Sequence, residues 1–193
     1  MNASRGNRME NYPQRKQNRL RTIRYDGNGA YFITICTKDR ASLFWAAGAA
    51  VPPVSANLAV GAATLAVGAA MRRPPEGLAP LGRIVWERIA GIDAVYGGVI
   101  SVDNYVVMPN HVHLLMSIHP GNAGGRRIGA PTISTVVNQL KGAVSKTAGF
   151  SCWQKSFHDH VVRDDRDYRD IWQYIDANPG RWTEDRYYTG VDG

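Results

Sequence analysis

His111 and His113 stand one residue apart in the run from Asn104 to Ile118. In an extended strand, side chains at positions i and i+2 point to the same face, so the two imidazoles would lie side by side. A neutral imidazole is a common metal ligand, and a polar pair on an apolar strand is costly unless it is hydrogen-bonded or bound. Two structural or exposed histidines are the alternative. A metal would need a third protein ligand from elsewhere in the chain.

Tyr174 and Asn178 supply groups of the missing kind. The pattern predicts a helix from Arg166 to Ala177, ended by Asn178-Pro179-Gly180, and residues i and i+4 share one helical face. The Tyr174 hydroxyl is a candidate nucleophile and the Asn178 amide oxygen a candidate metal ligand. The alternative is that Tyr174 packs in the core and Asn178 caps the helix before the proline.

The elements that would position these groups mix strands and helices without a regular βαβα repeat. Strands are predicted at 31–37, 99–108 and 111–118, and helices at 81–96 and from Pro131 onward, with Thr132 or Ser134 near the N-cap. The face of the histidine strand opposite the imidazoles is wholly apolar and should pack on a core. These features predict an α+β fold with an antiparallel sheet and helices packed against it.

The net charge of +7 and a pI of about 9.6 favour a polyanionic partner, most commonly nucleic acid. Residues 1–28 are polar and basic, as in a solvated tail or in an arm that folds onto a phosphate backbone. The rest of the chain, 29–190, is predicted to be a single domain. The candidate DNA contacts are Arg15, Lys16, Arg19, Arg21 and Arg24 of the arm, Arg126 and Arg127 of a glycine-rich loop, Lys141 and Arg163.

A low-complexity Ala/Gly insertion lies within 46–80 and contains a tandem seven-residue duplication, 58–64 and 65–71. No charge occurs from Ala41 to Met71, but alanine and glycine supply little transfer energy and Pro52-Pro53 interrupt the run. We therefore predict a surface loop and no membrane span. Cys36 and Cys152 lack metal or disulfide spacing, and no signal sequence is evident, which fits a reducing cytoplasm.

Other aromatic and histidine residues have two readings each. His160 could donate to phosphate, but a structural or surface role is favoured, and Asp159 prevents His158 and His160 from forming a second His-hydrophobic-His motif. Trp153, Gln154 and Phe157 could contact DNA, and the two aromatic residues could equally belong to the core. Packing is favoured for the remaining aromatic residues near the C-terminus, which are Trp172, Trp182, Tyr187 and Tyr188.

Four runs in order carry a resemblance to a known family. They are YFITICTKD at 31–39, YVVMPNHVH at 105–113, WQKSFHDH at 153–160 and YIDANP at 174–179. With them the chain resembles the REP-associated tyrosine transposases, which are single-tyrosine HUH transposases. "HUH" denotes His, hydrophobic residue, His, which His111-Val112-His113 matches. The motif alone is weak, whereas the ordered set is specific and covers most of residues 15–187.

The resemblance implies a ferredoxin-like or RRM-like sheet, the HUH endonuclease fold, and a nucleophile at Tyr174. It further implies that His111, His113 and Asn178 bind Mg²⁺ or Mn²⁺. Tyr174 would attack a phosphate of single-stranded DNA beside a hairpin, leaving a 5′-phosphotyrosine link that allows strands to be rejoined in transposition. The partner would be single-stranded or hairpin DNA near the nucleoid, and relatives include both monomers and homodimers. The insertion departs from the family pattern but should spare the site.

Two other functions stay open from the sequence. A domesticated DNA-binding protein would keep the fold without turnover, although the four intact site residues argue against it. A metal-dependent hydrolase that uses water as its nucleophile would not need Tyr174.

Overall fold

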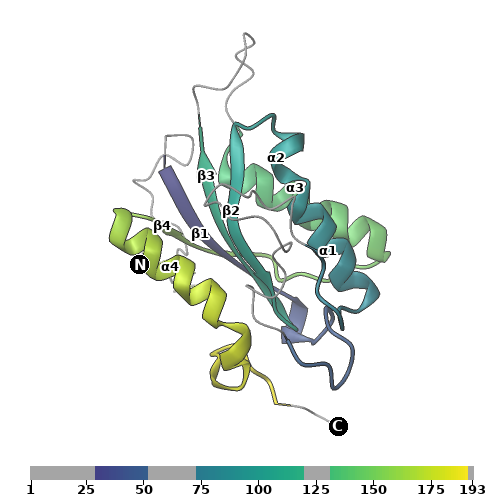
Figure 1. Cartoon of the computed structure of the whole chain (residues 1–193). Coiled ribbons are helices and arrows are strands. Elements are labelled where there is room, and N and C mark those ends of the chain that lie inside the picture. Colours follow the sequence, from purple (N-terminus) through teal and green to yellow (C-terminus); the bar gives the residue numbers. More distant parts are fainter. Residues whose placement is uncertain (1–28, 52–72, 120–130, 191–193) are drawn as a thin grey trace, which may run out of the picture.

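The computed structural model describes residues 29–51, 73–119 and 131–190. A four-stranded antiparallel sheet forms its centre and consists of β1 (Gly29–Cys36), β2 (Ile100–Val107), β3 (His111–Ile118) and β4 (His158–Val161). The strands lie in the order β2-β3-β1-β4, with the strongly apolar β1 and β3 in the middle. This is the ferredoxin-like order, so the predicted α+β fold is confirmed (Figure 1).

The helices surround this sheet. They are α1 (Pro80–Ala90), α2 (Ile92–Val95), α3 (Ile133–Ala148) and α4 (Asp165–Ala177), with short 3₁₀ turns η1 (Lys38–Arg40) and η5 (Pro179–Glu184). The sequence predicted one continuous helix over 81–96, and this prediction is wrong because the segment forms two helices, α1 and α2. Gly91 ends α1 and precedes α2, because glycine is a poor helix former and the chain turns there.

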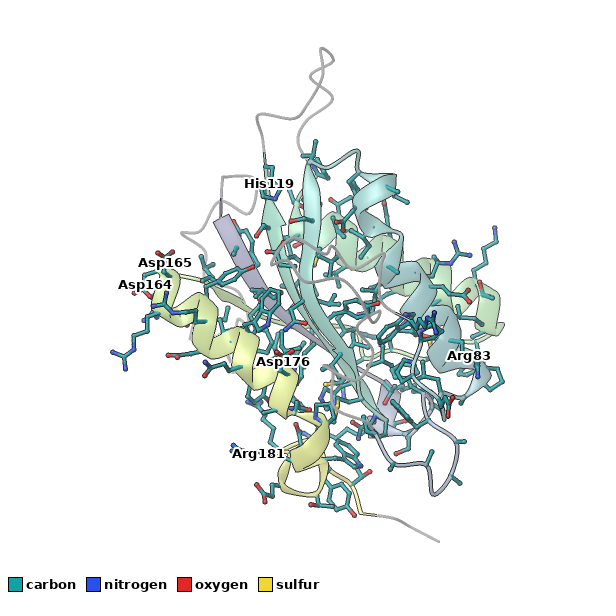
Figure 2. The ribbon with its side chains drawn as sticks, viewed as in Figure 1. Arg83, His119, Asp164, Asp165, Asp176 and Arg181 are labelled. Carbon is teal, nitrogen blue, oxygen red and sulfur yellow. The ribbon has the colours of Figure 1, made fainter. Side chains whose placement is uncertain are left out.

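Both long helices with predicted starts begin at a side-chain cap. The Thr132 hydroxyl accepts a hydrogen bond from the Thr135 amide at the start of α3, which confirms the predicted N-cap. The Asp164 carboxylate accepts from the amides of Arg166 and Asp167 and so fixes the first turn of α4 (Figure 2). These caps determine where each helix starts and therefore which residues face the sheet.

The two faces of the sheet have different partners. α1 and α3 cover one face, and α4 lies on the other (Figure 1). Val112, Leu114, Met116 and Ile118 of β3 belong to the large core under α1 and α3. Leu115 packs in a smaller core under α4 with Val106, Met108, Ile171 and Ile175. The alternation predicted for β3 is confirmed, and it puts His111 and His113 on the α4 face.

The segments that flank the insertion lie next to each other. Trp45 and Leu78 form an isolated antiparallel bridge, and the Ala46 amide donates to the Gly77 carbonyl at 2.9 Å. The insertion therefore lies between β1 and α1 in the chain, as predicted. Residues 52–72 fall outside the described ranges. Within those ranges no helix combines the length and the apolar character that crossing a membrane requires.

Candidate metal and tyrosine site

His111 and His113 are fully buried on β3, and their Nε2 atoms are 3.1 Å apart. The side chains alternate along the strand as expected, so both rings project from the α4 face. Each ring is held from behind. The Nδ1 atom of His111 lies 2.9 Å from the Asn110 amide oxygen, and that of His113 lies 2.8 Å from the Thr34 hydroxyl on β1. The predicted pairing of the two imidazoles is thus present in the fold.

The protonation of His111 follows from its partner. An amide oxygen can only accept, so His111 Nδ1 must donate and its Nε2 carries the lone pair. Without a cation, both Nε2 atoms are satisfied when His113 Nε2 carries a proton and donates it to the lone pair of His111 Nε2. A bound cation would replace that proton, because the Thr34 hydroxyl can accept a hydrogen bond from His113 Nδ1 as readily as it donates one.

Both imidazoles are held neutral. Burial, followed by the positive charges of Arg186 and Arg40, lowers the pKa of His111 to about 3. Burial also lowers the pKa of His113 well below its usual range, and the adjacent His111 acts in the same direction. Metal ligation requires the neutral ring, so both imidazoles can bind a cation at neutral pH once the His113 proton moves from Nε2 to Nδ1.

Tyr174 stands on α4 directly over this pair. Its hydroxyl oxygen is 3.4 Å from Nε2 of His113, and the side chain keeps 42% of its surface exposed. Phe32 of β1 packs edge-on against the phenol, with ring centres 5.8 Å apart, and also contacts His113. Burial, and then the charge of Asp185, raise the pKa of Tyr174 above 10. The phenol is therefore accessible and positioned, and it is protonated at neutral pH.

Asn178 follows the last turn of α4, with its backbone amide donating to the Tyr174 carbonyl at 3.0 Å. The residue thus caps the helix, which is the structural alternative considered above, and its side chain also reaches the Asp185 carboxylate that lies beside His111. Its Nδ2 donates to Asp185 at 2.9 Å, whereas its buried Oδ1 has no hydrogen-bond partner among the described residues. An unpaired buried acceptor costs free energy unless something positive occupies the space before it.

Asp185 is a site residue that the sequence analysis missed. One of its carboxylate oxygens lies 4.0 Å from Nε2 of His111, and ligand atoms of His111, His113 and Asp185 all fall within 4.8 Å of one another. It lies beyond η5 in a segment without periodicity, so only proximity in space reveals it. Two imidazole nitrogens with a carboxylate and an orphaned amide oxygen suit a divalent cation. The residues present therefore fit the implied metal.

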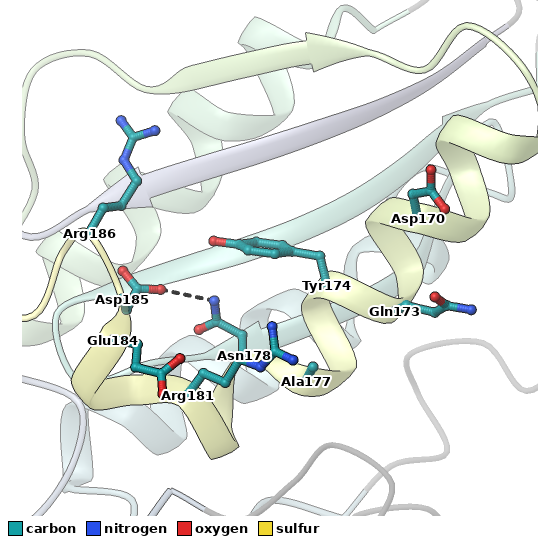
Figure 3. A pocket seen from close by; sticks show the side chains of 9 residues that line it. All are labelled: Asp170, Gln173, Tyr174, Ala177, Asn178, Arg181, Glu184, Asp185 and Arg186. Carbon is teal, nitrogen blue, oxygen red and sulfur yellow. Dashed lines mark hydrogen bonds between the residues drawn. The ribbon is translucent and has the colours of Figure 1, made fainter.

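A cleft of about 630 Å³ opens beside the tyrosine (Figure 3). Tyr174, Asn178 and Asp185 line it together with exposed charged side chains, including those of Arg181 and Arg186. The phenol hydroxyl points toward the side where Asp185 and Arg186 lie (Figure 3). The cleft therefore gives access to Tyr174 and to Asp185, which lies beside the buried His111.

The other predicted site residues lie in several places. Arg15, Lys16, Arg19, Arg21, Arg24, Arg126 and Arg127 fall outside the described residues. Lys141 lies on α3, across the sheet from Tyr174, where its ammonium donates to the carbonyls of Gln154 and Lys155. Arg163 is exposed just before α4. Their contacts with DNA stay predictions.

The accessory residues divide in a similar way. His160 of β4 lies 2.8 Å from the Asp167 carboxylate, a structural pairing of the kind favoured above. Trp153 and Phe157 are buried in the core under α1 and α3, which decides between their two readings. Tyr187 packs against the His111 ring, with centres 4.7 Å apart, so its packing role includes the site itself.

No family model matches the chain. An uncharacterised protein of Haemophilus influenzae is 27% identical over 195 residues, which cover 90% of this chain and 93% of the relative. A solved REP-associated tyrosine transposase, bound to a REP hairpin, is similar in structure with a TM-score of 0.53 and 17% identity, over 90% of this chain and 78% of the other. A proposed transposase of Deinococcus radiodurans reaches a TM-score of only 0.40 at 17% identity, over 81% and 94% of the two chains. The chain thus shares the fold of the hairpin-bound transposase.

Proposed function

We propose that the protein is a metal-dependent endonuclease and strand transferase that acts on single-stranded DNA beside a hairpin. The observation that carries the proposal is the position of the Tyr174 hydroxyl, 3.4 Å from one of two facing imidazole nitrogens. A hydrolase that activates water would not need an accessible phenol at this position. The REP hairpin held by the structural neighbour and the net charge of +7 support DNA as the substrate.

The chemistry assigns a separate role to each group. His111, His113 and Asn178 would hold Mg²⁺ or Mn²⁺, with Asp185 beside them. Such an ion would supply positive charge to polarise the scissile phosphate and offset the charge that develops on it. Asn110 and Thr34 keep the imidazoles oriented, and Phe32 holds the phenol against His113.

Tyr174 attacks phosphorus, so that a bond forms between its phenol oxygen and phosphorus while the bond from phosphorus to the 3′-oxygen breaks. The phenol loses its proton and the departing 3′-oxygen gains one, which leaves a free 3′-hydroxyl and a 5′-phosphotyrosine link. One phosphodiester replaces another, so a 3′-hydroxyl can reverse the step and join strands without an energy source. This reversibility is what DNA transposition requires.

The test is covalent capture of DNA. The full chain is incubated with Mn²⁺ and a hairpin oligonucleotide with a labelled single-stranded flank, and adducts are separated on a denaturing gel. We expect a labelled protein band that disappears in Tyr174→Phe and persists in Tyr188→Phe, a matched change outside α4. His111→Gln should also abolish the band, because it removes a ligand of the ion.

Each other outcome identifies a different function. Cleavage that survives Tyr174→Phe would mean that water is the nucleophile and the protein is a hydrolase. Binding without cleavage by the unchanged protein, across the divalent ions tested, would mean a DNA-binding protein that has lost turnover.

A further inference from the structure

We infer that Arg40 and Arg186 form a clamp for a backbone phosphate of the DNA strand beside Tyr174. Both side chains are exposed, and they come from segments far apart in the chain, the η1 turn and the residues after η5. The identity of the ligand rests on the proposed function. The clamp itself rests on the aromatic ring that supports the two guanidinium groups and on the lack of a carboxylate partner for them among the described residues.

A single aromatic ring supports both arginines. The Cζ atoms of Arg40 and Arg186 lie 5.6 Å and 4.8 Å from the centre of the Tyr187 ring. That ring is buried and packs on the imidazole of His111. Stacking on an aromatic face restrains a guanidinium while leaving its N–H groups directed outward, as recognition of a phosphate requires.

Carboxylates of the described ranges leave both guanidinium groups unpaired. In the part of the chain that the structure describes, neither guanidinium lies within 4.0 Å of a carboxylate oxygen. The nearby Asp185 accepts hydrogen bonds from Asn178 and from the Tyr187 amide instead. The Arg40 guanidinium donates to the backbone carbonyl of Arg186 at 3.5 Å. Two like charges gathered over one ring are unfavourable unless an anion joins them.

The backbone beneath Arg40 is strained in a way that holds it there. Asp39 and Arg40 both have φ of 57°, in the left-handed region that residues with a Cβ rarely adopt. The Asn110 amide donates to the carbonyl of Arg40 at 3.2 Å and to that of Tyr187 at 2.7 Å. One buried side chain therefore ties Arg40 to Tyr187, whose ring supports both arginines, and through its oxygen it orients the ring of His111.

The clamp is close enough to serve the same strand as the tyrosine. Arg186 lines the cleft that contains Tyr174, and the phenol hydroxyl points toward that side (Figure 3). A strand that brings one phosphate to Tyr174 would place a neighbouring phosphate near the two arginines. The clamp would thus hold the strand in register for attack.

The experiment measures binding without chemistry. Full-length protein in EDTA is titrated against a labelled single-stranded oligonucleotide at several salt concentrations, and the slope of log affinity against log salt is recorded. Each lost phosphate contact should reduce this slope by about 0.7, so Arg40→Gln with Arg186→Gln, which together hold one phosphate, should reduce it by about 0.7. Arg83→Gln on α1, across the sheet, is the matched charge control and should leave the slope unchanged (Figure 2).

Lysine variants separate binding from structure. If the arginines contact phosphate, Arg40→Lys with Arg186→Lys should restore most of the slope, because an ammonium still pairs with phosphate. An unchanged slope in a folded glutamine variant would overturn the clamp. The clamp would also be overturned if the glutamine variant lost slope, the lysine variant failed to restore it and the melting temperature fell. The arginines would then only hold the fold together. The covalent-capture assay is independent, so failure of the nuclease and failure of the clamp are distinguishable.

Discussion

At the scale of single residues, the site is a set of buried polar groups that hold one another in position. Asn110 shows this most clearly, because its oxygen accepts from His111 while its nitrogen donates to two backbone carbonyls. The same residue is fully buried, so its own amide could not find water instead. Ring orientation, metal affinity and the position of the chain after η5 are therefore coupled through one side chain.

Replacing Asn110 with alanine should weaken both the site and the fold. Two buried groups and one part-buried carbonyl lose their partner, so we expect the free energy of unfolding to fall by about 2 kcal/mol. Affinity for Mn²⁺ should fall about 10- to 100-fold, because the His111 ring is no longer held. Urea unfolding and Mn²⁺ titration by electron paramagnetic resonance measure the two effects. Asn138→Ala, on the exposed face of α3, should change neither, and an unchanged Mn²⁺ affinity in Asn110→Ala would contradict the coupling.

The depressed pKa of His111 predicts how stability depends on pH in the metal-free protein. Folded His111 stays neutral down to about pH 3, whereas the unfolded chain takes up a proton below about pH 6.5. Between these values the unfolded state binds more protons, so stability is retained above pH 6.5 and is lost as the pH falls. His111 alone should lower the free energy of unfolding by roughly 2 kcal/mol between pH 7 and pH 5.

Urea unfolding in EDTA at both pH values measures this difference. His111→Gln should reduce it by the contribution of that histidine. His158→Gln, which removes an exposed histidine on β4, should retain it, because water solvates that side chain in both states. Equal pH dependence in the unchanged protein and in His111→Gln would show that burial does not control the ring.

At the scale of elements, the site depends on how closely three layers approach one another. α4 carries Tyr174 and places it over β3 because Ile171 and Ile175 pack against Leu115. On the other face, α1 approaches the chain so closely at Gly82 that a Cβ there would lie 2.0 Å from the backbone oxygen of Phe44. The sheet that displays the histidines is therefore fixed by packing on both faces.

Two glycine-to-alanine changes test this packing. Alanine usually stabilises a helix interior by about 1 kcal/mol relative to glycine. Gly142 on α3 has open space around it, so Gly142→Ala should raise the free energy of unfolding by roughly 0.4–1 kcal/mol. Gly82→Ala must move α1 away from the Phe44 backbone, so it should lower the free energy of unfolding by about 1–3 kcal/mol. Thermal and urea unfolding measure both, and a stabilising Gly82→Ala would mean that the contact is loose.

At the scale of the whole molecule, the insertion is separable from the site. Its flanks meet through the Trp45–Leu78 bridge and the hydrogen bond from Ala46 to Gly77, next to α1. The tyrosine and the histidines lie on the α4 face of the sheet, whereas α1 covers the other face. The extra residues are therefore not needed to bring the site residues together.

Replacing residues 52–72 with a short Gly/Ser linker should leave the fold and the site intact. Loop-closure entropy changes only slowly with length, so we expect the free energy of unfolding to change by no more than about 1 kcal/mol. Adduct formation with the hairpin oligonucleotide should continue at the rate of the unchanged protein. Loss of the adduct in a folded deletion variant, checked by circular dichroism, would mean that the insertion takes part in the reaction.

The sequence by itself determined the local features of this protein. Alternation along 111–118 fixed which face of the strand carries the imidazoles, helical spacing put Tyr174 and Asn178 on one face, and the Thr132 cap began α3 as expected. These features follow from the period of a single element, which a single sequence records. The break at Gly91 was the exception, because one glycine within an otherwise helical pattern does not reveal whether the helix continues past it.

Only the tertiary structure decided which distant groups meet. Asp185 and Thr34 reach the histidines from two separate segments, and Arg40 joins Arg186 over one ring. None of these residues stands in a periodic pattern that points to the site. Their convergence depends on strand order, on the packing of α4 and on the path of the chain after it, and these are properties of the packed whole.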